Sequence, residues 1–314
     1  MKHFSISVVI PNFNGAKLLA ESLPPLVREL SRYEHEIIIA DDDSTDGSVE
    51  FIKEHYPEIK IVKGPYNAGF STNINRGIAL AGKKLTFLMN SDIILGKNYF
   101  DNQFSYFKGQ ETFGVMGQII GFYDNKVQDT AKYPARSGVL INGSRNYLKN
   151  ENKIPTMLPS LFLSGANALL DTEKLKGLNG FDEIFSPFYG EDLDLGLRAW
   201  RKGWKCWYEH SAVCKHKTSN TIKSTSSVWK VKVIAARNKL SLHYIHLDGM
   251  DRMLWAVTIF LSLIMKAFTF NWSYHRGFYM FLTGLSSARR SRKQLLEYGR
   301  SLRNVYASIL SLIP

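Results

Sequence analysis

The stretch Phe87-Leu88-Met89-Asn90-Ser91-Asp92 decides the fold, because an apolar strand ends there on polar side chains. The apolar run from Leu85 to Met89 is typical of a strand buried on both faces of a sheet. Open α/β sheets bind ligands at the carboxyl ends of their parallel strands, which is where Asp92 would lie. A carboxylate there could hold a divalent cation, and the cation could neutralise a diphosphate.

The segments before this stretch alternate between strand and helix patterns. Strands are predicted at residues 5–10, 36–40 and 59–62, and helices at residues 16–23, 48–56 and 71–81. Pro24 and Pro25 are expected to break the first helix and to start a second turn of helix. The alternation predicts a parallel, doubly wound α/β sheet.

Three carboxylates, Asp41 to Asp43, follow the second predicted strand. They could form a solvated turn that caps the next helix. Alternatively, one of them could accept a hydrogen bond from the base or ribose of a nucleotide. No Gly-x-Gly-x-x-Gly or Walker sequence follows the first strand, which argues against a dinucleotide oxidoreductase and a P-loop kinase.

The middle of the chain has weaker periodicity. Residues 121–160 are predicted to be a variable loop region, where substrate choice often resides. Residues 161–170 are predicted to be a strand interrupted by the small residues Ser164, Gly165 and Ala166. Small residues within a strand indicate the close approach of a ligand or of another backbone.

A cluster of acids opens the helix predicted over residues 191–202. The helix dipole favours acids at this end, so a capping role is one interpretation. The other is a general base that takes a proton from a sugar hydroxyl. Three carboxylates within four residues, Glu191, Asp192 and Asp194, are more than capping requires. His216 ends a strand predicted over residues 205–216 and could bind the same cation as Asp92.

The composition is that of a globular protein, with 314 residues of which 45% are hydrophobic and 22% charged. The two cysteines do not make a disulfide framework, so we expect a reducing, cytoplasmic setting. The net charge of +12 is uneven along the chain. Residues 223–314 carry 14 Lys and Arg against 3 Asp and Glu, and the rest of the chain is almost neutral. The basic character therefore needs a local explanation.

The basic segment, residues 223–314, has helical patterns. Apolar residues recur at helical spacing from Trp229 to Leu247 with lysines and arginines around them. Apolar runs follow at residues 253–265 and 277–285, and both are shorter than the roughly 20 residues that span a bilayer. The helices could dock on an anionic membrane surface, pack on the predicted α/β domain or on another subunit, or include a spanning helix. We expect docking on the inner face of the cytoplasmic membrane.

Together these stretches resemble the family 2 glycosyltransferases, inverting enzymes of the GT-A fold, and in particular their rhamnosyltransferase-like bacterial members. The matching elements occur in the family's order, at residues 8–15, 41–47, 67–70, 75–77, 90–92, 164–166 and 190–194. We therefore expect a GT-A catalytic domain over residues 1–222 and a helical extension over residues 223–314. The nucleotide-sugar-binding part would be about residues 1–95 and the acceptor part about 96–222. The family's metal motif is often Asp-x-Asp, whereas this chain has Asn90 at the first position.

The resemblance implies a role for each matching residue. The nucleotide-sugar site would be lined by Pro11, Asn12, Asn14, Asp41, Asp42, Asn67, Gly69, Phe70, Asn75 and Ser91. Asp92 and His216 would hold Mg²⁺ or Mn²⁺ on the diphosphate of a UDP-, dTDP- or GDP-linked donor. Asp192 would be the catalytic base, with Glu191, Ser164 and Gly165 on the acceptor side. The implied reaction moves the sugar, with inversion, to a hydroxyl of a glycan or lipid-linked acceptor in bacterial cell-surface polysaccharide synthesis.

Other functions remain open at this point. A sugar nucleotidyltransferase should show a Gly-rich loop with Arg and Lys after the first strand, which residues 11–15 lack. A non-catalytic relative would bind the nucleotide-sugar without turning it over. A nucleic-acid-binding protein would need its basic residues on one face with exposed aromatic rings. Here the basic residues flank apolar helical runs, so no nucleic-acid partner is expected. The oligomeric state is left open.

Overall fold

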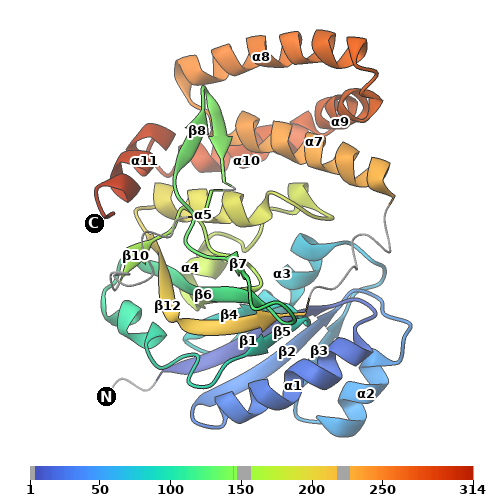
Figure 1. The fold of residues 1–314 in the computed structure, drawn as a ribbon, viewed down its shortest axis with the longest axis vertical. Helices are drawn as coiled ribbons and strands as arrows, with labels where there is room; N and C mark the ends of the chain where they lie inside the picture. Colours follow the sequence, from blue (N-terminus) through green and yellow to red (C-terminus); the bar gives the residue numbers. More distant parts are fainter. Residues whose placement is uncertain (1–3, 144, 147–156, 218–226, 314) are drawn as a thin grey trace.

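A computed structural model of the chain describes residues 4–143, 145–146, 157–217 and 227–313. Within them a ten-stranded sheet runs in the order β10-β12-β6-β11-β4-β1-β2-β3, with β5 on β12 and β7 on β6 (Figure 1). Its strands are β1 (Ser5–Asn12), β2 (Glu34–Asp41), β3 (Lys60–Lys63), β4 (Leu85–Met89), β5 (Ile93–Leu95), β6 (Thr112–Gly121), β7 (Val127–Asp129), β10 (Leu158–Pro159), β11 (Asn167–Asp171) and β12 (Lys205–His216). A separate hairpin is formed by β8 (Ala135–Ser137) and β9 (Leu140–Asn142).

The described residues form ten α-helices, of which some pack on the sheet and the C-terminal ones stack beyond them (Figure 1). They are α1 (Ala16–Leu30), α2 (Ser48–His55), α3 (Phe70–Leu80), α4 (Thr172–Gly177), α5 (Glu191–Arg201), α7 (Val228–His246), α8 (Gly249–Phe268), α9 (Trp272–Thr283), α10 (Leu285–Leu296) and α11 (Leu302–Leu310). Two 3₁₀ helices, η1 (Gln103–Lys108) and η3 (Glu183–Phe185), lie in the connections.

The strands β4, β1, β2 and β3 are parallel to one another, and β11 continues the sheet antiparallel to β4. Successive side chains of a strand point to opposite faces, and β1 follows this rule. Ile6 and Val8 pack into the apolar cluster that α1 contributes to, whereas Val9 packs into the cluster that contains Ile74 of α3. The predicted doubly wound α/β fold is confirmed.

The break predicted at Pro24-Pro25 is wrong, because α1 runs through both prolines to Leu30. One face of the helix is fully buried through Leu19, Leu23, Leu26 and Leu30. Burying a leucine side chain stabilises a fold by about 1.5–3 kcal/mol. Four such side chains contribute at least as much as the two prolines cost, at about 3 kcal/mol each inside a helix.

The strand predicted over residues 161–170 is also wrong in its first half. Only Asn167–Asp171 forms a strand, β11, and the residues before it form a turn that the bond from Asn167 N to Ser164 O closes at 3.2 Å. The region 121–160, predicted to be a loop, contains β7 to β10, and its residues 144 and 147–156 lie outside the described residues. The elements β5, η1 and β6 are not among the predicted ones.

The C-terminal helices pack over α5 on the far side from α1 and α2 (Figure 1). The predicted basic helix is α7, but its apolar residues Val233, Leu240 and Ile245 are buried in the core. This stripe therefore faces the protein, as expected from the alternative of packing on the catalytic domain, and not a membrane. Across the described part of the chain, no helix combines the length and apolarity needed to cross a bilayer.

Buried arginines attach these helices to one another and to α5. Arg292 of α10 donates to the carbonyls of Tyr244, Ile245 and Leu247, at distances of 3.0, 2.8 and 2.7 Å. The last carbonyls of a helix have no partner within the helix, so Arg292 satisfies the end of α7. Arg201 of α5 donates to His246 O at 2.6 Å and pairs with Asp248 at 3.0 Å.

Candidate active site

The pairing of β5 with β12 brings Asp92 and His216 together. His216 lies opposite Ile93 in this antiparallel pair, and its Nε2 is 3.1 Å from Asp92 Oδ2. This hydrogen bond is the main cause that raises the pKa of His216. On the other side of the ring, Nδ1 is 2.7 Å from Gln128 Oε1, which fixes the orientation of the imidazole. Sequence reasoning missed Gln128, whose role depends on the pairing of β7 with β6.

The side chains at this point fit a divalent cation. Asp92 supplies a carboxylate and His216 an imidazole, and Asn90 Oδ1 is a buried oxygen with no hydrogen-bond partner among the described residues. Oxygen ligands suit Mg²⁺ and Mn²⁺, and Mg²⁺ is usually bound through one or two carboxylates plus substrate phosphates. The described residues contain no cluster of three or more His, Cys, Asp and Glu side chains that could hold a metal alone. The donor set therefore suits a cation that arrives with a diphosphate.

Asp192 forms the second centre, in the first turn of α5. The helix begins after Gly190, which has φ of 99° and provides no side-chain cap. Asp192 Oδ1 instead accepts a hydrogen bond from Gly165 N at 3.1 Å. Burial, followed by the neighbouring Glu191, raises the pKa of Asp192 well above its usual range. Glu191 Oε2 is itself buried without a hydrogen-bond partner in the described structure, and burial raises the pKa of Glu191 as well.

The third acid of this turn, Asp194, has a structural role. It is fully buried, and its two oxygens lie 2.7 Å from Arg198 Nε and 2.9 Å from His246 Nε2. Burial disfavours its charge, but Arg198 and His246 lower the pKa of Asp194 below its usual value. Asp194 thus attaches α5 to α7, and only Glu191 and Asp192 remain for chemistry.

The dipeptide Gly165-Ala166 links the two centres. Gly165 N donates to Asp192, and Ala166 O accepts from Asn90 N at 3.2 Å. A Cβ atom at residue 165 would lie 2.8 Å from Asp192 Oδ1 and 3.1 Å from Phe70 Cζ, so no larger residue fits without a shift. The close approach predicted from the small residues is present, and it joins the end of β4 to the start of α5.

The loops after β1 and β2 hold each other. Asn12 Nδ2 donates to Asp41 Oδ2 at 2.8 Å, and Asn14 Oδ1 accepts from Thr45 N at 2.8 Å. Asp41 is fully buried, whereas Asn14 is exposed. Pro11 pairs in register with Ala40 at the same edge of the sheet. The buried Asn12 Oδ1 has no hydrogen-bond partner within the described structure.

Asp42 holds the loop at residues 67–70. Its two oxygens accept from Ala68 N at 3.0 Å and from Gly69 N at 2.8 Å, and Arg76 pairs with it at 3.1 Å. Gly69 has φ of 88°, and a Cβ atom there would lie 2.5 Å from Pro187 Cα, so glycine is required. The loop therefore packs against the segment that leads into α5, with Asn67 exposed at its start.

Three other predicted residues take positions of their own. Asn75 braces α3 against Phe181, donating to its carbonyl at 2.8 Å and accepting from its amide at 2.9 Å, so both ends of its side chain are engaged with a segment other than the loops after β1 and β2. Ser91 is half-buried beside Gly15. Ser164 is buried, with its amide 3.2 Å from the sulfur of Met116.

Asn238 of α7 is a positioning residue that the sequence did not reveal. Its Nδ2 lies 2.7 Å from Phe185 O, 2.8 Å from Phe188 O and 2.8 Å from Tyr189 O, and the residue is almost fully buried. It therefore holds the backbone that enters Gly190 and Asp192. The bonds join residues about 50 positions apart, so no local motif could have revealed them.

We expect Asn238→Leu to leave these buried carbonyls unsatisfied, which costs about 1–3 kcal/mol of stability. Because the same carbonyls precede the first turn of α5, turnover should fall by about tenfold or more while affinity for the donor nucleotide stays within about twofold. Thermal melts and steady-state kinetics would check both. Unchanged turnover in the folded variant would show that α7 does not position this loop.

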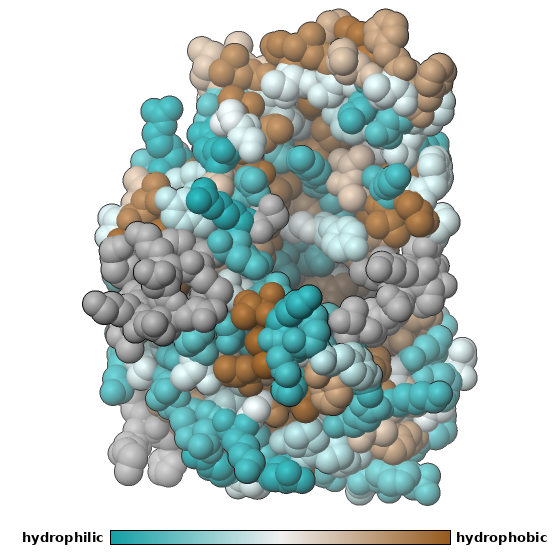
Figure 2. All heavy atoms as spheres, in the orientation of Figure 1, coloured by the Kyte–Doolittle hydropathy of each residue, from teal (hydrophilic) through white to brown (hydrophobic). Residues whose placement is uncertain are grey.

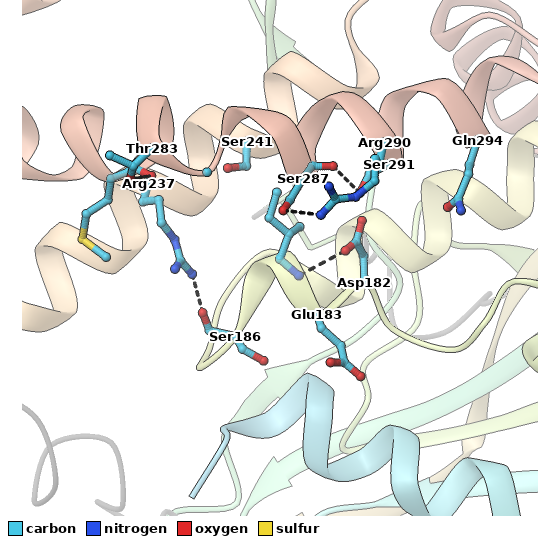
Figure 3. Close-up of a pocket in the computed structure, with 13 residues that line it drawn as sticks. Asp182, Glu183, Ser186, Arg237, Ser241, Thr283, Ser287, Arg290, Ser291 and Gln294 are labelled. Carbon is cyan, nitrogen blue, oxygen red and sulfur yellow. Dashed lines mark hydrogen bonds between the residues drawn. The ribbon is translucent and has the colours of Figure 1, made fainter.

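A cavity of about 660 Å³ lies between the segment 182–186, α7 and the junction of α9 with α10 (Figure 3). Arg237 and Ser186 hydrogen-bond to each other across one side of it, and Asp182, Arg290 and Ser287 line the other. None of the predicted site residues lines this cavity. It borders the segment that Asn238 holds, which precedes the first turn of α5.

Comparison with known proteins shows which family the chain belongs to. The sequence profile of Glycosyl transferase family 2 matches residues 7–178, more than half of the chain. An N-acetylglucosaminyl-diphospho-decaprenol L-rhamnosyltransferase of Mycobacterium tuberculosis (strain ATCC 25618 / H37Rv) is 26% identical over 217 residues, which are 61% of this chain and 69% of the relative.

Solved structures share the fold. GalNAc-T7 with UDP, GalNAc and Mn²⁺ superposes with a TM-score of 0.64 at 16% identity, over 79% of this chain and 49% of that one. The mannosyltransferase PcManGT from Pyrobaculum calidifontis, in complex with GDP-Man and Mn²⁺, superposes with a TM-score of 0.54 at 14% identity. The superposition covers 99% of this chain and 86% of that one. The predicted GT-A fold is confirmed, and the chain belongs to glycosyl transferase family 2.

Proposed function

We propose that this glycosyltransferase moves a sugar, with inversion, from a UDP-, dTDP- or GDP-linked donor to a hydroxyl group, with Asp192 as the base. The observation that carries the proposal is the connection through Gly165-Ala166, which holds Asp192 and the Asn90–Asp92 segment on either side of one dipeptide. Donor phosphates at Asp92 and an acceptor hydroxyl at Asp192 would then meet over the same backbone.

The two carboxylate oxygens of Asp192 would have different roles. Oδ1 accepts from Gly165 N, while Oδ2 receives no hydrogen bond from the described residues and the side chain is half-buried. We assign Oδ2 the proton of the acceptor hydroxyl, whose oxygen attacks the anomeric carbon from the face opposite the leaving diphosphate. Glu191 lies beside it and would orient the acceptor, together with Ser164 and Gly165.

The donor nucleotide would lie at the carboxyl ends of β1 and β2. Pro11, Asn12, Asn14 and Ser91 would line this pocket, and Asp41 and Asp42 would accept from the base or ribose through their remaining lone pairs. Asn67, Gly69 and Phe70 would close over the nucleotide, since Asp42 and Pro187 already hold their loop.

Asp92, His216 and the Asn90 oxygen would hold Mg²⁺ or Mn²⁺. When bound, the cation supplies positive charge to the diphosphate as it leaves. The Mn²⁺ in the GalNAc-T7 and PcManGT complexes supports this assignment. The family often has a second carboxylate where this chain has Asn90, so cation binding here would depend more strongly on His216.

We further propose a glycan or lipid-linked acceptor, bacterial cell-surface polysaccharide synthesis, and a location on the inner face of the cytoplasmic membrane. The name of the mycobacterial relative, which describes a sugar carried on diphospho-decaprenol, supports such an acceptor. In this proposal residues 1–222 form the catalytic domain and residues 223–314 the membrane-associating extension.

A donor screen tests the function. With Mn²⁺ present, we expect one class of nucleotide-sugar to raise the Tm of the full chain by several degrees and to be slowly hydrolysed to the nucleoside diphosphate. Binding with no hydrolysis or transfer would favour the non-catalytic alternative. Release of inorganic diphosphate from a sugar phosphate and a nucleoside triphosphate would instead identify a nucleotidyltransferase.

A further inference from the structure

The outermost helix, α8, turns its apolar side outward. It lies across the end of the molecule's long axis, farthest from the sheet, with hydrophobic side chains gathered over it (Figures 1 and 2). Phe268 is 77% exposed, Phe260 63% and Leu261 54%. Side chains three or four positions apart share one face of a helix. The exposed apolar residues recur at this spacing from Met250 to Phe268, with Ile264 and Met265 between Leu261 and Phe268. Six of them define what we call the α8 face: Met253, Leu254, Val257, Phe260, Leu261 and Phe268.

The side of α8 that faces the protein is the more polar one. Asp251 pairs with Arg136 of the β8–β9 hairpin at 2.8 Å, and Thr258 and Ser262 are less exposed than Val257 and Leu261. Ile259 and Leu263 are also only partly exposed on this side. Trp255 alone is well buried, among the rings of His243, Tyr244 and Phe281. A helix on the surface of a soluble domain has the opposite arrangement. The α8 face is therefore suited to an apolar medium.

Aromatic and basic side chains border this face. Phe270 is exposed in the turn after α8, Trp272 at the start of α9 and Tyr279 later in α9. Tryptophan and tyrosine prefer the level of lipid headgroups, where one end of the ring meets water. Arg252, Lys266 and Arg276 supply positive charge, while the one acid of α8, Asp251, is already paired.

We propose that the α8 face lies in the headgroup and upper acyl region of an anionic lipid bilayer, with the helix parallel to the membrane. This refines the membrane location proposed above and is independent of the sugar-transfer chemistry. The helix crosses the end of the long axis, so a plane touching it meets no catalytic strand (Figure 1). An interfacial helix of this kind enters the bilayer by about 5–10 Å.

Charge favours lipid over a second copy of the chain as the occupant. Residues 223–314 carry an excess of 11 positive charges, and a symmetric dimer through the α8 face would bring two such segments together. Anionic headgroups would instead attract them, by an interaction that salt screens.

Vesicle flotation tests the proposal without substrate. The full chain should float with vesicles of equal parts phosphatidylglycerol and phosphatidylcholine, less with phosphatidylcholine alone, and less at high salt. Leu261→Glu should lower the partition coefficient about tenfold or more, since it places a charge in the face. The matched control is Leu80→Glu, which places the same charge on α3, outside the α8 face. The two leucines have similar exposed fractions, 47% for Leu80 and 54% for Leu261.

A second readout begins with the wild-type chain. Lipids brominated on the acyl chains should quench the fluorescence of the bound protein, and most of that quenching should disappear in Trp272→Phe. The proposal would be overturned if the full chain did not float, or if Leu261→Glu and Leu80→Glu lowered the partition coefficient equally. It would also be overturned if brominated lipids did not quench the fluorescence of the bound wild-type protein. A dimer in sedimentation that Leu261→Glu dissociates would overturn it too, because a second copy would then occupy the face.

Discussion

Replacing Asp192 with asparagine should reduce turnover by about 10²-fold or more while donor binding stays near that of the wild type. The amide keeps the size of the side chain, and its oxygen can still accept from Gly165 N, which Asp192 Oδ1 does at 3.1 Å. What it loses is the ability to take a proton from the acceptor. Steady-state kinetics with the donor found in the screen, and titration of the nucleoside diphosphate, would measure the two quantities separately.

The matched control removes an acid from the first turn of another helix. Glu173 is exposed at the start of α4, where an acid also benefits from the helix dipole. Glu173→Gln should leave turnover unchanged. If both variants lost activity to the same extent, or if Asp192→Asn turned over like the wild type, Asp192 would not be the base.

The raised pKa of Asp192 adds a dependence on pH. A base must be ionised to act, so the wild-type rate should still be rising with pH where an ordinary carboxyl group has already lost its proton. The stability of the fold changes with pH in the opposite direction to the rate. A pKa that is higher in the folded state than in the unfolded state stabilises the fold below the unfolded pKa, and this contribution is lost as the pH rises through the folded pKa. The asparagine side chain cannot ionise, so the Tm of Asp192→Asn should be higher than that of the wild type at about pH 8. The difference between the two Tm values should disappear near pH 4.

The chain before Asp92 could be predicted well because each element carries its own local signal. The apolar run Leu85–Met89 and the polar residues after it were sufficient to place β4 and the edge at which Asp92 lies. Only the prolines of α1 misled, because local propensity says nothing about the leucines buried beneath them.

The structure after Asp92 was harder to predict because it depends on contacts between distant segments of the chain. The turn before β11 exists because Gly165 meets Asp192 of a helix that comes later in the chain. Asn238 holds the loop before that helix through backbone carbonyls, which carry no sequence signature. The amphipathic stripe predicted for α7 is only partly present: Trp229 is exposed, and the helix is buried almost all round from Leu240 to His246. Its apolar residues cover the core and not a membrane, because a pattern shows which residues are apolar and not what covers them.

Asp92→Asn should lower the affinity for Mn²⁺, measured with a nucleoside diphosphate present, by about 10²-fold or more. Asn90 is already neutral, so Asp92 is the one carboxylate of its motif, and the substitution leaves two amides where the diphosphate needs a counter-charge. Turnover should fall by a comparable factor, since stabilisation of the leaving diphosphate is lost. The amide still reaches His216, so the fold and the pairing of β5 with β12 should persist.

Electron paramagnetic resonance of free Mn²⁺, titrated with protein in the presence of UDP, dTDP or GDP, would give the affinity without any turnover. Glu58→Gln, an exposed carboxylate before β3, serves as the control for a general change of charge. His216→Ala should weaken Mn²⁺ binding in the same direction, because Nε2 of His216 and Oδ2 of Asp92 are only 3.1 Å apart and would bind one ion. Normal Mn²⁺ affinity in Asp92→Asn would place the cation away from the end of β4, and the donor with it.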